Sequence, residues 1–266
     1  MNGNYRTLLA GAFVAVLAIG PAADGAAAEW GSIKGKLIYE GKPEVKPVNL
    51  TADAAYCSEH KPMEELIVVG KEGALQNVFV YLAVARNKKV DIHPDYKAED
   101  LKPAILDNKG CRFEPHAQTL WTAQPLEIRN SDPLAHNTNG TKLLFNTDFN
   151  ETIAKDRPLV KKFDKSEPIP TEITCNVHPW MNAVVLIRDN PYMAVSGEDG
   201  SFEIKNVPAG KQEFVFWHQA QGNLRDLEVG EETADRKGQV KVEVPAGETI
   251  DLGEIKVAPD ILGQKG

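Results

Sequence analysis

The sequence predicts an all-β protein built from two packed sandwiches. Short alternating or β-branched segments recur along the chain, Gly, Pro, Asn and Asp separate them, and no long window keeps a helical period. A short helix near Asp95–Leu101 stays open as an alternative. In chain order, the expected strands are Ser32–Tyr39, Leu75–Val84, Leu126–Arg129, Glu172–Cys175, Ala183–Arg188, Ser201–Ile204, Glu213–Trp217, Val240–Val244 and Thr249–Val257.

The first 28 residues have the pattern of a secretory signal peptide. Arg6 precedes the apolar run Leu8–Ile19, and the small residues Ala26–Ala28 precede Glu29. The run is about a dozen residues long, shorter than the roughly 20 that cross a bilayer. A mitochondrial-type leader would be richer in Arg and Ser, and a retained anchor would be longer. We therefore expect a mature chain that starts near Glu29, is periplasmic or secreted, and does not span a membrane.

Composition limits the class of partner. The chain has 266 residues, of which 42% are hydrophobic and 26% charged, as in ordinary globular proteins. Its formal charge is -8, from 30 basic and 38 acidic residues. Nucleic-acid binders need clustered Lys and Arg, so the charge argues against that function.

Cysteine use is informative because an exported protein meets an oxidising compartment. The chain has three cysteines, so an odd thiol must be paired elsewhere, ligated or reactive. A disulfide between Cys57 and Cys111 would close a loop of about 55 residues and stabilise the fold by about 4 kcal/mol in the chain-entropy model. Cys175 is then left over. Two alternatives remain open: Cys175 is itself in the disulfide, or all three cysteines are buried free thiols.

One loop between two expected strands carries three soft or borderline metal ligands. Cys175, His178 and Met181 follow one another at intervals of three residues. A second imidazole, His136, comes just past an earlier strand, about 40 residues upstream. Two imidazoles, a thiolate and a weak thioether form the donor set of blue copper sites. The spacing therefore predicts a copper site.

The donor types fit electron transfer because thiolate and thioether stabilise Cu(I) while imidazole suits Cu(II). Zinc would favour a harder or all-thiolate fourth ligand. The competing interpretation makes Met181 and Trp180 core residues and His178 a hydrogen-bonded surface imidazole, with the spacing due to chance.

These residues carry a family resemblance. His136-Asn137 and the Cys175–Met181 loop resemble the copper loops of cupredoxins, and the short second loop with Pro179 and Trp180 is similar to that of amicyanin. The match covers roughly 71–190. It implies a Greek-key sandwich, one type 1 copper ion on His136, Cys175, His178 and Met181, and an Asn137 that hydrogen-bonds near the sulfur and joins the two loops.

The resemblance also implies a function. The segments Cys111–His116 and Asn130–Asp132 extend it to exported bacterial cupredoxin-like proteins labelled methylamine-utilisation proteins. An electron carrier would use Cys175 as its conduit, His178 as the solvent-edge ligand, and Pro179 with Trp180 as an apolar docking rim. Its partner would be a periplasmic dehydrogenase or a c-type cytochrome.

A second resemblance covers the C-terminal part. Glu198–Ile204, Val207–Gly210 and Phe214–His218 resemble carboxypeptidase regulatory-like domains, which are small transthyretin-like β-sandwiches. The expected organisation is a signal peptide (1–28), an N-terminal β segment (29–70), a cupredoxin-like copper domain (71–190), the regulatory-like sandwich (191–258) and a tail (259–266). Two topologies stay open, because the N-terminal segment could instead pair with the C-terminal sandwich and make the copper domain an insertion.

The remaining histidines have weaker patterns. His116 is a candidate outer metal ligand or electron-exit group, His218 beside Trp217 is expected to be structural, and His60 and His93 have no partner pattern. An exposed Trp217 could instead stack on a sugar. No nucleophile elbow, phosphate loop or paired-His protease motif occurs in the sequence, so an electron carrier, not an enzyme, is expected. Two alternatives are an envelope scaffold that contacts glycan or protein, and a copper storage or delivery protein.

Overall fold

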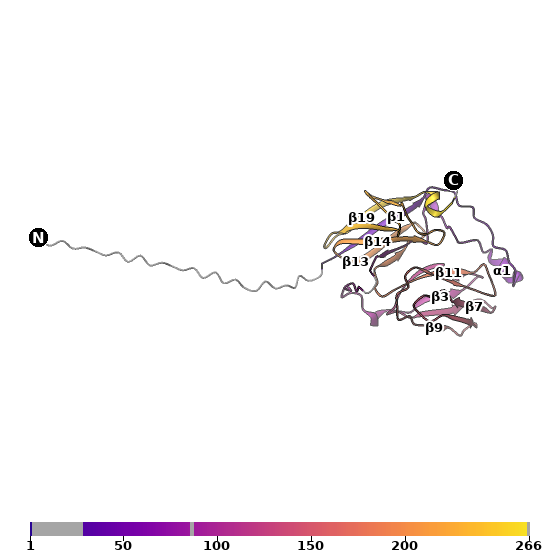
Figure 1. Ribbon diagram of the computed structural model, residues 1–266. Coiled ribbons are helices and arrows are strands. Elements are labelled where there is room, and N and C mark those ends of the chain that lie inside the picture. The colour runs from indigo at the N-terminus through magenta and orange to yellow at the C-terminus, as the bar shows by residue number, and fades with distance from the viewer. Residues whose placement is uncertain (2–28, 86–87, 265–266) are drawn as a thin grey trace.

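The computed structural model describes residues 1, 29–85 and 88–264, and it confirms the all-β class. Residues 2–28 of the expected signal peptide lie outside this part of the chain. The strands form two halves (Figure 1). One half contains β1 (Trp30–Tyr39), β13 (Ser201–Pro208), β14 (Gly210–His218) and β19 (Thr249–Val257), and we call it the outer sandwich. The other contains β3 (Ala104–Asn108), β7 (His136–Gly140), β9 (Leu159–Lys161) and β11 (Asn182–Arg188), and we call it the metal-end sandwich.

The outer sandwich has two main sheets and a small ribbon. Its three-stranded sheet has the order β13-β1-β19, with β1 antiparallel to β13 and parallel to β19. The facing sheet runs β12-β2-β14-β15, with β18 also paired to β14. The strands not yet delimited are β2 (Phe79–Leu82), β12 (Met193–Val195), β15 (Gly222–Asn223), β18 (Gln239–Val244) and the ribbon pair β16 (Glu228–Val229) and β17 (Glu232–Thr233).

The metal-end sandwich has a five-stranded sheet, β5-β11-β10-β7-β8, over a four-stranded sheet, β4-β3-β6-β9. Its remaining strands are β4 (Phe113–Glu114), β5 (Ala117–Trp121), β6 (Leu126–Asn130), β8 (Phe149–Ile153) and β10 (Thr171–Thr174). Helical structure in the described residues is short: α1 (Ala54–His60) and the 3₁₀ turns η1 (Lys71–Gly73), η2 (Ala98–Asp100) and η3 (Pro259–Leu262).

The two sandwiches pack on each other through strands that are buried on both faces. In β11, Val185 and Ile187 face the core of the metal-end sandwich, whereas Val184 and Leu186 join a third cluster with Trp217 of β14. Successive side chains of a strand point to opposite faces, so such a strand needs a continuous apolar run. This third cluster is the interface between the two halves.

The strands that pair in each sandwich do not come from the residue ranges expected for the two domains. The strands of the metal-end sandwich all lie between residues 104 and 188, whereas the outer sandwich takes β1 and β2 from before this range and β12 to β19 from after it. The strand β2 lies inside the expected 71–190 unit, yet it pairs with β12 and β14. The metal-end sandwich is thus inserted between strands of the outer one.

All nine expected strands overlap observed ones, and Thr249–Val257 has the same bounds as β19. In the alternative helical stretch near residues 95–101, the structure has only the 3₁₀ turn η2. The short strands of polar sequence, such as β7, were missed. So was α1, which at seven residues is too short for its period to be read.

His218 in β14 should make stability depend on pH. It is fully buried, and burial, with the nearby His116, lowers its pKa from 6.5 to about 4. A depressed histidine pKa means that the unfolded chain binds a proton before the folded one does, so stability falls as pH drops from about 6.5 to 4. The loss should be about 3 kcal/mol from this one group.

Urea denaturation at several pH values checks this prediction. His218→Asn, whose side-chain oxygen can replace Nδ1 as the acceptor of the Ala220 N–H, should flatten the wild-type slope between pH 6.5 and 4. The exposed His60→Asn serves as the control and should keep the slope. Equal slopes for His218→Asn and wild type would contradict the assignment.

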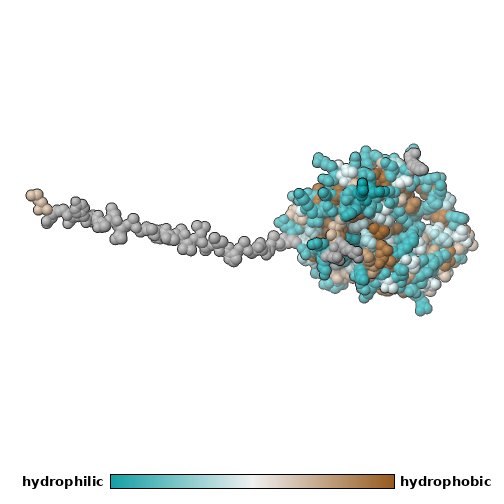
Figure 2. Space-filling view, viewed as in Figure 1, coloured by the Kyte–Doolittle hydropathy of each residue, from teal (hydrophilic) through white to brown (hydrophobic). Residues whose placement is uncertain are grey.

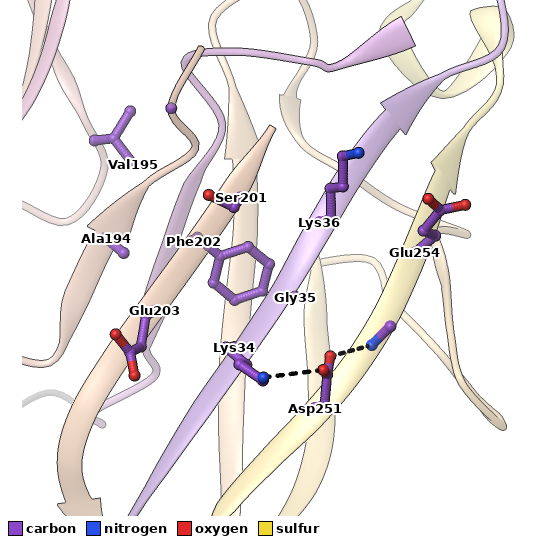
Figure 3. Close-up of a pocket in the computed structure, with 12 residues that line it drawn as sticks. Lys34, Gly35, Lys36, Ala194, Val195, Ser201, Phe202, Glu203, Asp251 and Glu254 are labelled. Atoms are coloured by element: carbon purple, nitrogen blue, oxygen red, sulfur yellow. Dashed lines mark hydrogen bonds and ion pairs between the residues drawn. The ribbon is translucent and has the colours of Figure 1, made fainter. Parts of the chain in front are cut away.

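The surface seen in Figure 2 is mostly hydrophilic, with separate apolar areas. None of the helices in the described ranges has the length and apolarity to pass through a membrane. An open hollow of about 640 Å³ lies on the outer sandwich, where Lys34 of β1 points toward Asp251 of β19, 3.2 Å away (Figure 3). Its charged side chains belong to the three-stranded sheet, away from the expected metal loops.

Candidate metal centre

The two expected metal loops meet at one end of the five-stranded sheet. Cys175 directly follows β10, and β10 and β11 form an antiparallel pair closed by the loop 175–181. Two backbone hydrogen bonds tighten this loop: Cys175 N–H donates to the Met181 carbonyl (3.1 Å), and Met181 N–H donates to the His178 carbonyl (2.8 Å). His136 opens β7, which is adjacent to β10 in the sheet. The sheet register therefore brings the second imidazole to the loop.

Three of the four expected ligands cluster. One ligand atom each from His136, Cys175 and His178 lies within 4.8 Å of the other two. The two imidazole rings are 4.6 Å apart between centroids, and the Cys175 sulfur is 3.8 Å from His178 Nδ1. Both histidines are 0% exposed and Cys175 is 2% exposed. Such a buried set of imidazole and thiol groups could hold a metal ion.

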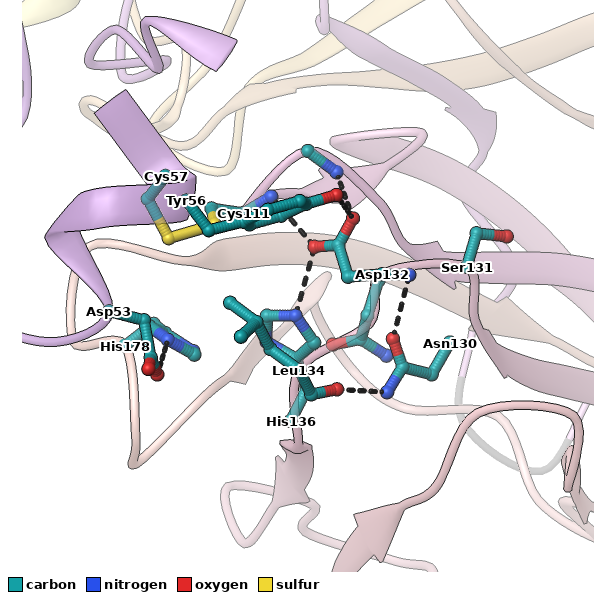
Figure 4. A network of polar contacts seen from close by, with 12 residues as sticks. Asp53, Tyr56, Cys57, Cys111, Asn130, Ser131, Asp132, Leu134, His136 and His178 are labelled. Carbon is teal, nitrogen blue, oxygen red and sulfur yellow. Dashed lines mark hydrogen bonds and ion pairs between the residues drawn. A yellow bond between two sulfur atoms is a disulfide. The ribbon is translucent and has the colours of Figure 1, made fainter. Parts of the chain in front are cut away.

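Asp132 holds the first imidazole. Its Oδ2 atom lies 2.9 Å from His136 Nε2 (Figure 4). The same carboxylate accepts hydrogen bonds from the backbone N–H groups of Gly110 (2.7 Å) and Cys111 (2.9 Å) and from the Tyr56 hydroxyl (3.0 Å). Asp132 is therefore fixed from several sides, and it fixes the ring of His136.

Asp53 holds the second imidazole. Its Oδ2 atom lies 3.0 Å from His178 Nε2, although the two residues are 125 positions apart in the sequence (Figure 4). The expectation that His178 is the solvent-edge ligand is wrong, because Asp53 and the rings of His136 and Trp180 lie against it. The motifs that carry the family resemblance did not include Asp53 or any other residue of the N-terminal segment.

The environment of Cys175 favours its thiolate. Burial acts to raise the pKa of the thiol, but His136 and the backbone N–H groups of Asn137, Val177 and His178 outweigh burial and lower it. Asn137 joins the loops as expected from the resemblance, since its Oδ1 lies 3.4 Å from the Cys175 sulfur and accepts a hydrogen bond from the Asn176 N–H at 2.6 Å. A lowered thiol pKa is what a metal ligand needs.

The pKa values of the two imidazoles are shifted in opposite directions. Burial opposes the charged form of His136, but Asp132 and Cys175 prevail and raise its pKa to about 9. Burial and the neighbouring His136 lower the pKa of His178, with Asp53 acting in the other direction. Burial tends to raise the pKa of Asp132, yet His136 and the backbone N–H groups of Cys111 and Gly110 lower it to about 2. The site thus keeps Asp132 ionised at any ordinary pH.

The donor atoms fit a metal ion by an observation independent of the motif. Among the described residues, His136 Nδ1 is buried and makes no hydrogen bond to a nitrogen or oxygen atom; apart from Asp132, the side chain that acts on this imidazole is the Cys175 thiol. A buried ring nitrogen without such a partner is a candidate ligand atom. Both Nε2 atoms are taken by carboxylates, so the Nδ1 atoms remain for ligation. A carboxylate on the far nitrogen is the usual support of a metal-bound histidine.

Met181 and the residues of the expected apolar rim, Pro179 and Trp180, lie next to the cluster in different surroundings. Met181 is 1% exposed and packs in the same core cluster as Cys175, so its position suits either a core residue or a ligand. Trp180 is half-buried, its ring lies 5.1 Å from that of His178, and its Nε1–H donates to the Cys111 carbonyl at 3.0 Å. Trp180 and Pro179 line an open groove of about 540 Å³.

The structure contains the Cys57–Cys111 disulfide, and Cys175 is the free cysteine. This settles the alternatives left open by the sequence. The disulfide lies beside the candidate metal centre and joins α1 to the loop whose Cys111 N–H donates to Asp132 (Figure 4).

His116 does not belong to the cluster. Its Nδ1 is 3.1 Å from the Asn182 carbonyl and its Nε2 is 2.8 Å from Gln219 Oε1. The role of His116 as an outer ligand stays a prediction.

The sugar-platform alternative for Trp217 is wrong, because this residue is 8% exposed and packs edge-on against Phe79 in the interface between the sandwiches.

The sequence interpretation missed both carboxylates. The sequence offered a signal for Asp132, because it stands four residues before His136. Asp53 and Tyr56 had no local signal, since the fold alone brings α1 over the metal loops.

No family model matches the chain, and no curated protein matches it. Solved structures that are similar include a point mutant of amicyanin in its oxidized form (14% identity, TM-score 0.29), covering 32% of this chain and 82% of that one. Amicyanin from Paracoccus versutus has 17% identity and a TM-score of 0.29, with coverage of 34% and 88%. The copper-containing nitrite reductase from Thermus scotoductus has 14% identity and a TM-score of 0.28, with coverage of 40% and 25%. These similarities are low, and the geometry of the site itself is the better guide to function.

Proposed function

We propose that this chain is an exported type 1 copper protein that carries single electrons between soluble redox partners. His136, Cys175 and His178 would hold the ion, with Met181 as the weak fourth ligand. When bound, the copper ion supplies a couple between Cu(I) and Cu(II). The proposal makes the protein a carrier and not an enzyme, and it takes the periplasmic or secreted location from the expected signal peptide.

One observation carries the proposal: the clustering of a buried thiol of lowered pKa with two imidazoles whose Nε2 atoms are both held by carboxylates. Two imidazoles and a thiolate are the strong ligands of blue copper sites. Zinc is less favoured, because the cluster offers a single thiolate with two imidazoles and has neither a third histidine nor a carboxylate among its ligand atoms.

The protein's own residues prepare the site for fast electron exchange. Asp132 and Asp53 fix the two imidazole rings, and Asn137 accepts a hydrogen bond from the start of the loop that carries Cys175. Burial of the ligands keeps water away. A rigid, dry donor set changes little between oxidation states, which lowers the reorganisation that each electron transfer requires.

The docking surface is assigned to the rim formed by Pro179 and Trp180. Because His178 is covered, the partly exposed Trp180 ring is the aromatic group that lies between His178 and the adjoining groove. Glu64, Glu65 and the exposed Leu66 also line this groove. An apolar patch with acidic neighbours fits a redox partner with a basic surface, such as a c-type cytochrome or a dehydrogenase.

The outer sandwich is proposed to be a support, not a redox unit. It encloses the insertion, and the described residues show no group of three or more candidate metal ligands in it. We place the copper unit at about residues 104–188, with the outer sandwich formed by the segments on either side.

A copper titration tests the proposal. The chain starting at residue 29 should gain an intense blue thiolate-to-copper absorption band on addition of Cu(II), saturating at an equimolar amount, and should be bleached and recoloured by a mild reductant and oxidant. A protein that binds Cu(II) tightly but exchanges electrons slowly would favour storage or delivery. A protein that stays colourless and copper-free would contradict the proposal.

A further inference from the structure

The helix α1 begins in an unusual way. Asp53 is its N-cap residue, and an aspartate there ordinarily accepts a hydrogen bond from the first turn of its own helix. Asp53 makes no such bond, and its backbone adopts a left-handed conformation (φ 45°, ψ 33°). Its carboxylate turns instead to His178 Nε2 at 3.0 Å. The local stabilisation of the helix is given up for a contact with a candidate ligand.

The same helix is tied to the other imidazole. The Tyr56 hydroxyl donates a hydrogen bond to Asp132, which holds His136. Cys57 forms the disulfide with Cys111. Cys111 in turn donates its N–H to Asp132. Asp53, Tyr56 and Cys57 therefore connect one short helix to the supports of both imidazoles.

Exposure indicates what this helix does. His178 is 0% exposed, whereas the Asp53 side chain above it is 42% exposed. The carboxylate is thus the layer between the Nε2 edge of His178 and solvent. Removing it would open this edge and also release the ring from its fixed orientation.

We propose that Asp53–His60, the α1 cap, closes the metal centre, with Asp53 as the positioning residue of His178 and the Cys57–Cys111 disulfide as the tether that keeps the cap in place. This inference rests on the proposed function for the identity of the metal. The carboxylate keeps the proton of His178 on Nε2 and leaves Nδ1 free as a ligand atom. The cap then slows exchange of the bound ion with competing ligands in solution.

Capture of copper by a chelator tests the cap in the full mature chain. Asp53→Ala should lower copper affinity by about 10–100-fold and speed capture by excess EDTA by a similar factor. Asp53→Asn, whose side-chain oxygen still accepts from Nε2–H, should recover most of the wild-type resistance. A matched control is Asp95→Ala, since Asp95 is an exposed aspartate 3.7 Å from the remote His93. It should leave the capture rate unchanged.

The Cys57→Ser/Cys111→Ser double variant tests the tether and should also speed capture. If it does not fold, the Asp53 variants still decide, because Asp53 is exposed and outside the core. The blue band of Asp53→Ala should change in position or intensity while its thermal stability stays near that of the wild type. A purely structural role for Asp53 would instead change stability and leave the band unchanged.

A measurement without metal separates this inference from the proposed function. Long-range proton–nitrogen NMR of the metal-free protein should find His178 protonated on Nε2 in the wild type and as mixed tautomers in Asp53→Ala. If the tautomers behave so but copper does not bind, the proposed function fails and the positioning role stands. If copper binds and Asp53→Ala equals wild type in capture rate, band and tautomer, the cap is refuted.

Discussion

Cys175→Ser should abolish the blue absorption band completely. Serine keeps the size of the side chain, but its hydroxyl does not ionise at neutral pH and offers a hard oxygen where soft sulfur suits Cu(I). In the wild type, hydrogen bonds to the sulfur lower the pKa of the thiol, which favours the thiolate form that the proposed copper ion would bind. The measurement is the visible spectrum of the variant after addition of Cu(II).

The control for this variant lies in the same loop. Val177→Ala changes an exposed side chain (43%) and should retain the band, since only the Val177 backbone contacts the sulfur. Circular dichroism of both variants should match the wild type. If Cys175→Ser keeps the intense band, the thiolate is not a ligand and the assignment of the site is wrong.

Glu167→Gln should cost about 3–5 kcal/mol of stability, the loss expected when charge-assisted hydrogen bonds are broken and buried donors are left unpaired. Glu167 is 0% exposed, and its carboxylate accepts hydrogen bonds from the backbone N–H groups of Leu144 (2.9 Å), Phe145 (3.1 Å) and Asn146 (3.1 Å). Glutamine would replace one acceptor oxygen by an NH₂ group that faces donors.

Urea denaturation measures this loss. Glu151→Gln is the matched control, because the Glu151 side chain is exposed and its carboxylate pairs with Lys161 at 3.4 Å, so its change should stay within about 0.5 kcal/mol. A Glu167→Gln variant as stable as the control would mean that water or a rearranged loop satisfies the three N–H groups.

The sequence indicated the fold where burial leaves a pattern. The strand β11 and the second half of β14 bury both faces and contain continuous apolar runs, so they were found. The strand β7 reads His-Asn-Thr-Asn-Gly and has no apolar residue. It is a strand because β8 and β10 pair with it, which only the tertiary fold determines.

In the candidate site, too, the sequence predicted some residues and could not predict others. Cys175, His178 and Met181 share one loop, and ligand spacing along a chain is visible in a sequence. Asp53 lies 125 residues from His178, and no periodicity or motif links them. The disulfide could be named as one of several pairings, but its place next to Asp132 depends on how the loop at Cys111 folds back.

The parallel pairing of β1 with β19 has a consequence for how the molecule folds. Ile33 lies opposite Ile250, more than 200 residues away in sequence, and also opposite Ile204 of β13. Contacts between such distant segments give a high contact order, and closing so long a loop is slow because its entropy is lost before the strand contacts compensate. The paired strands of the metal-end sandwich are much closer together in the sequence, so this sandwich is free to form first. We therefore expect the outer three-stranded sheet to be the last part of the protein to fold.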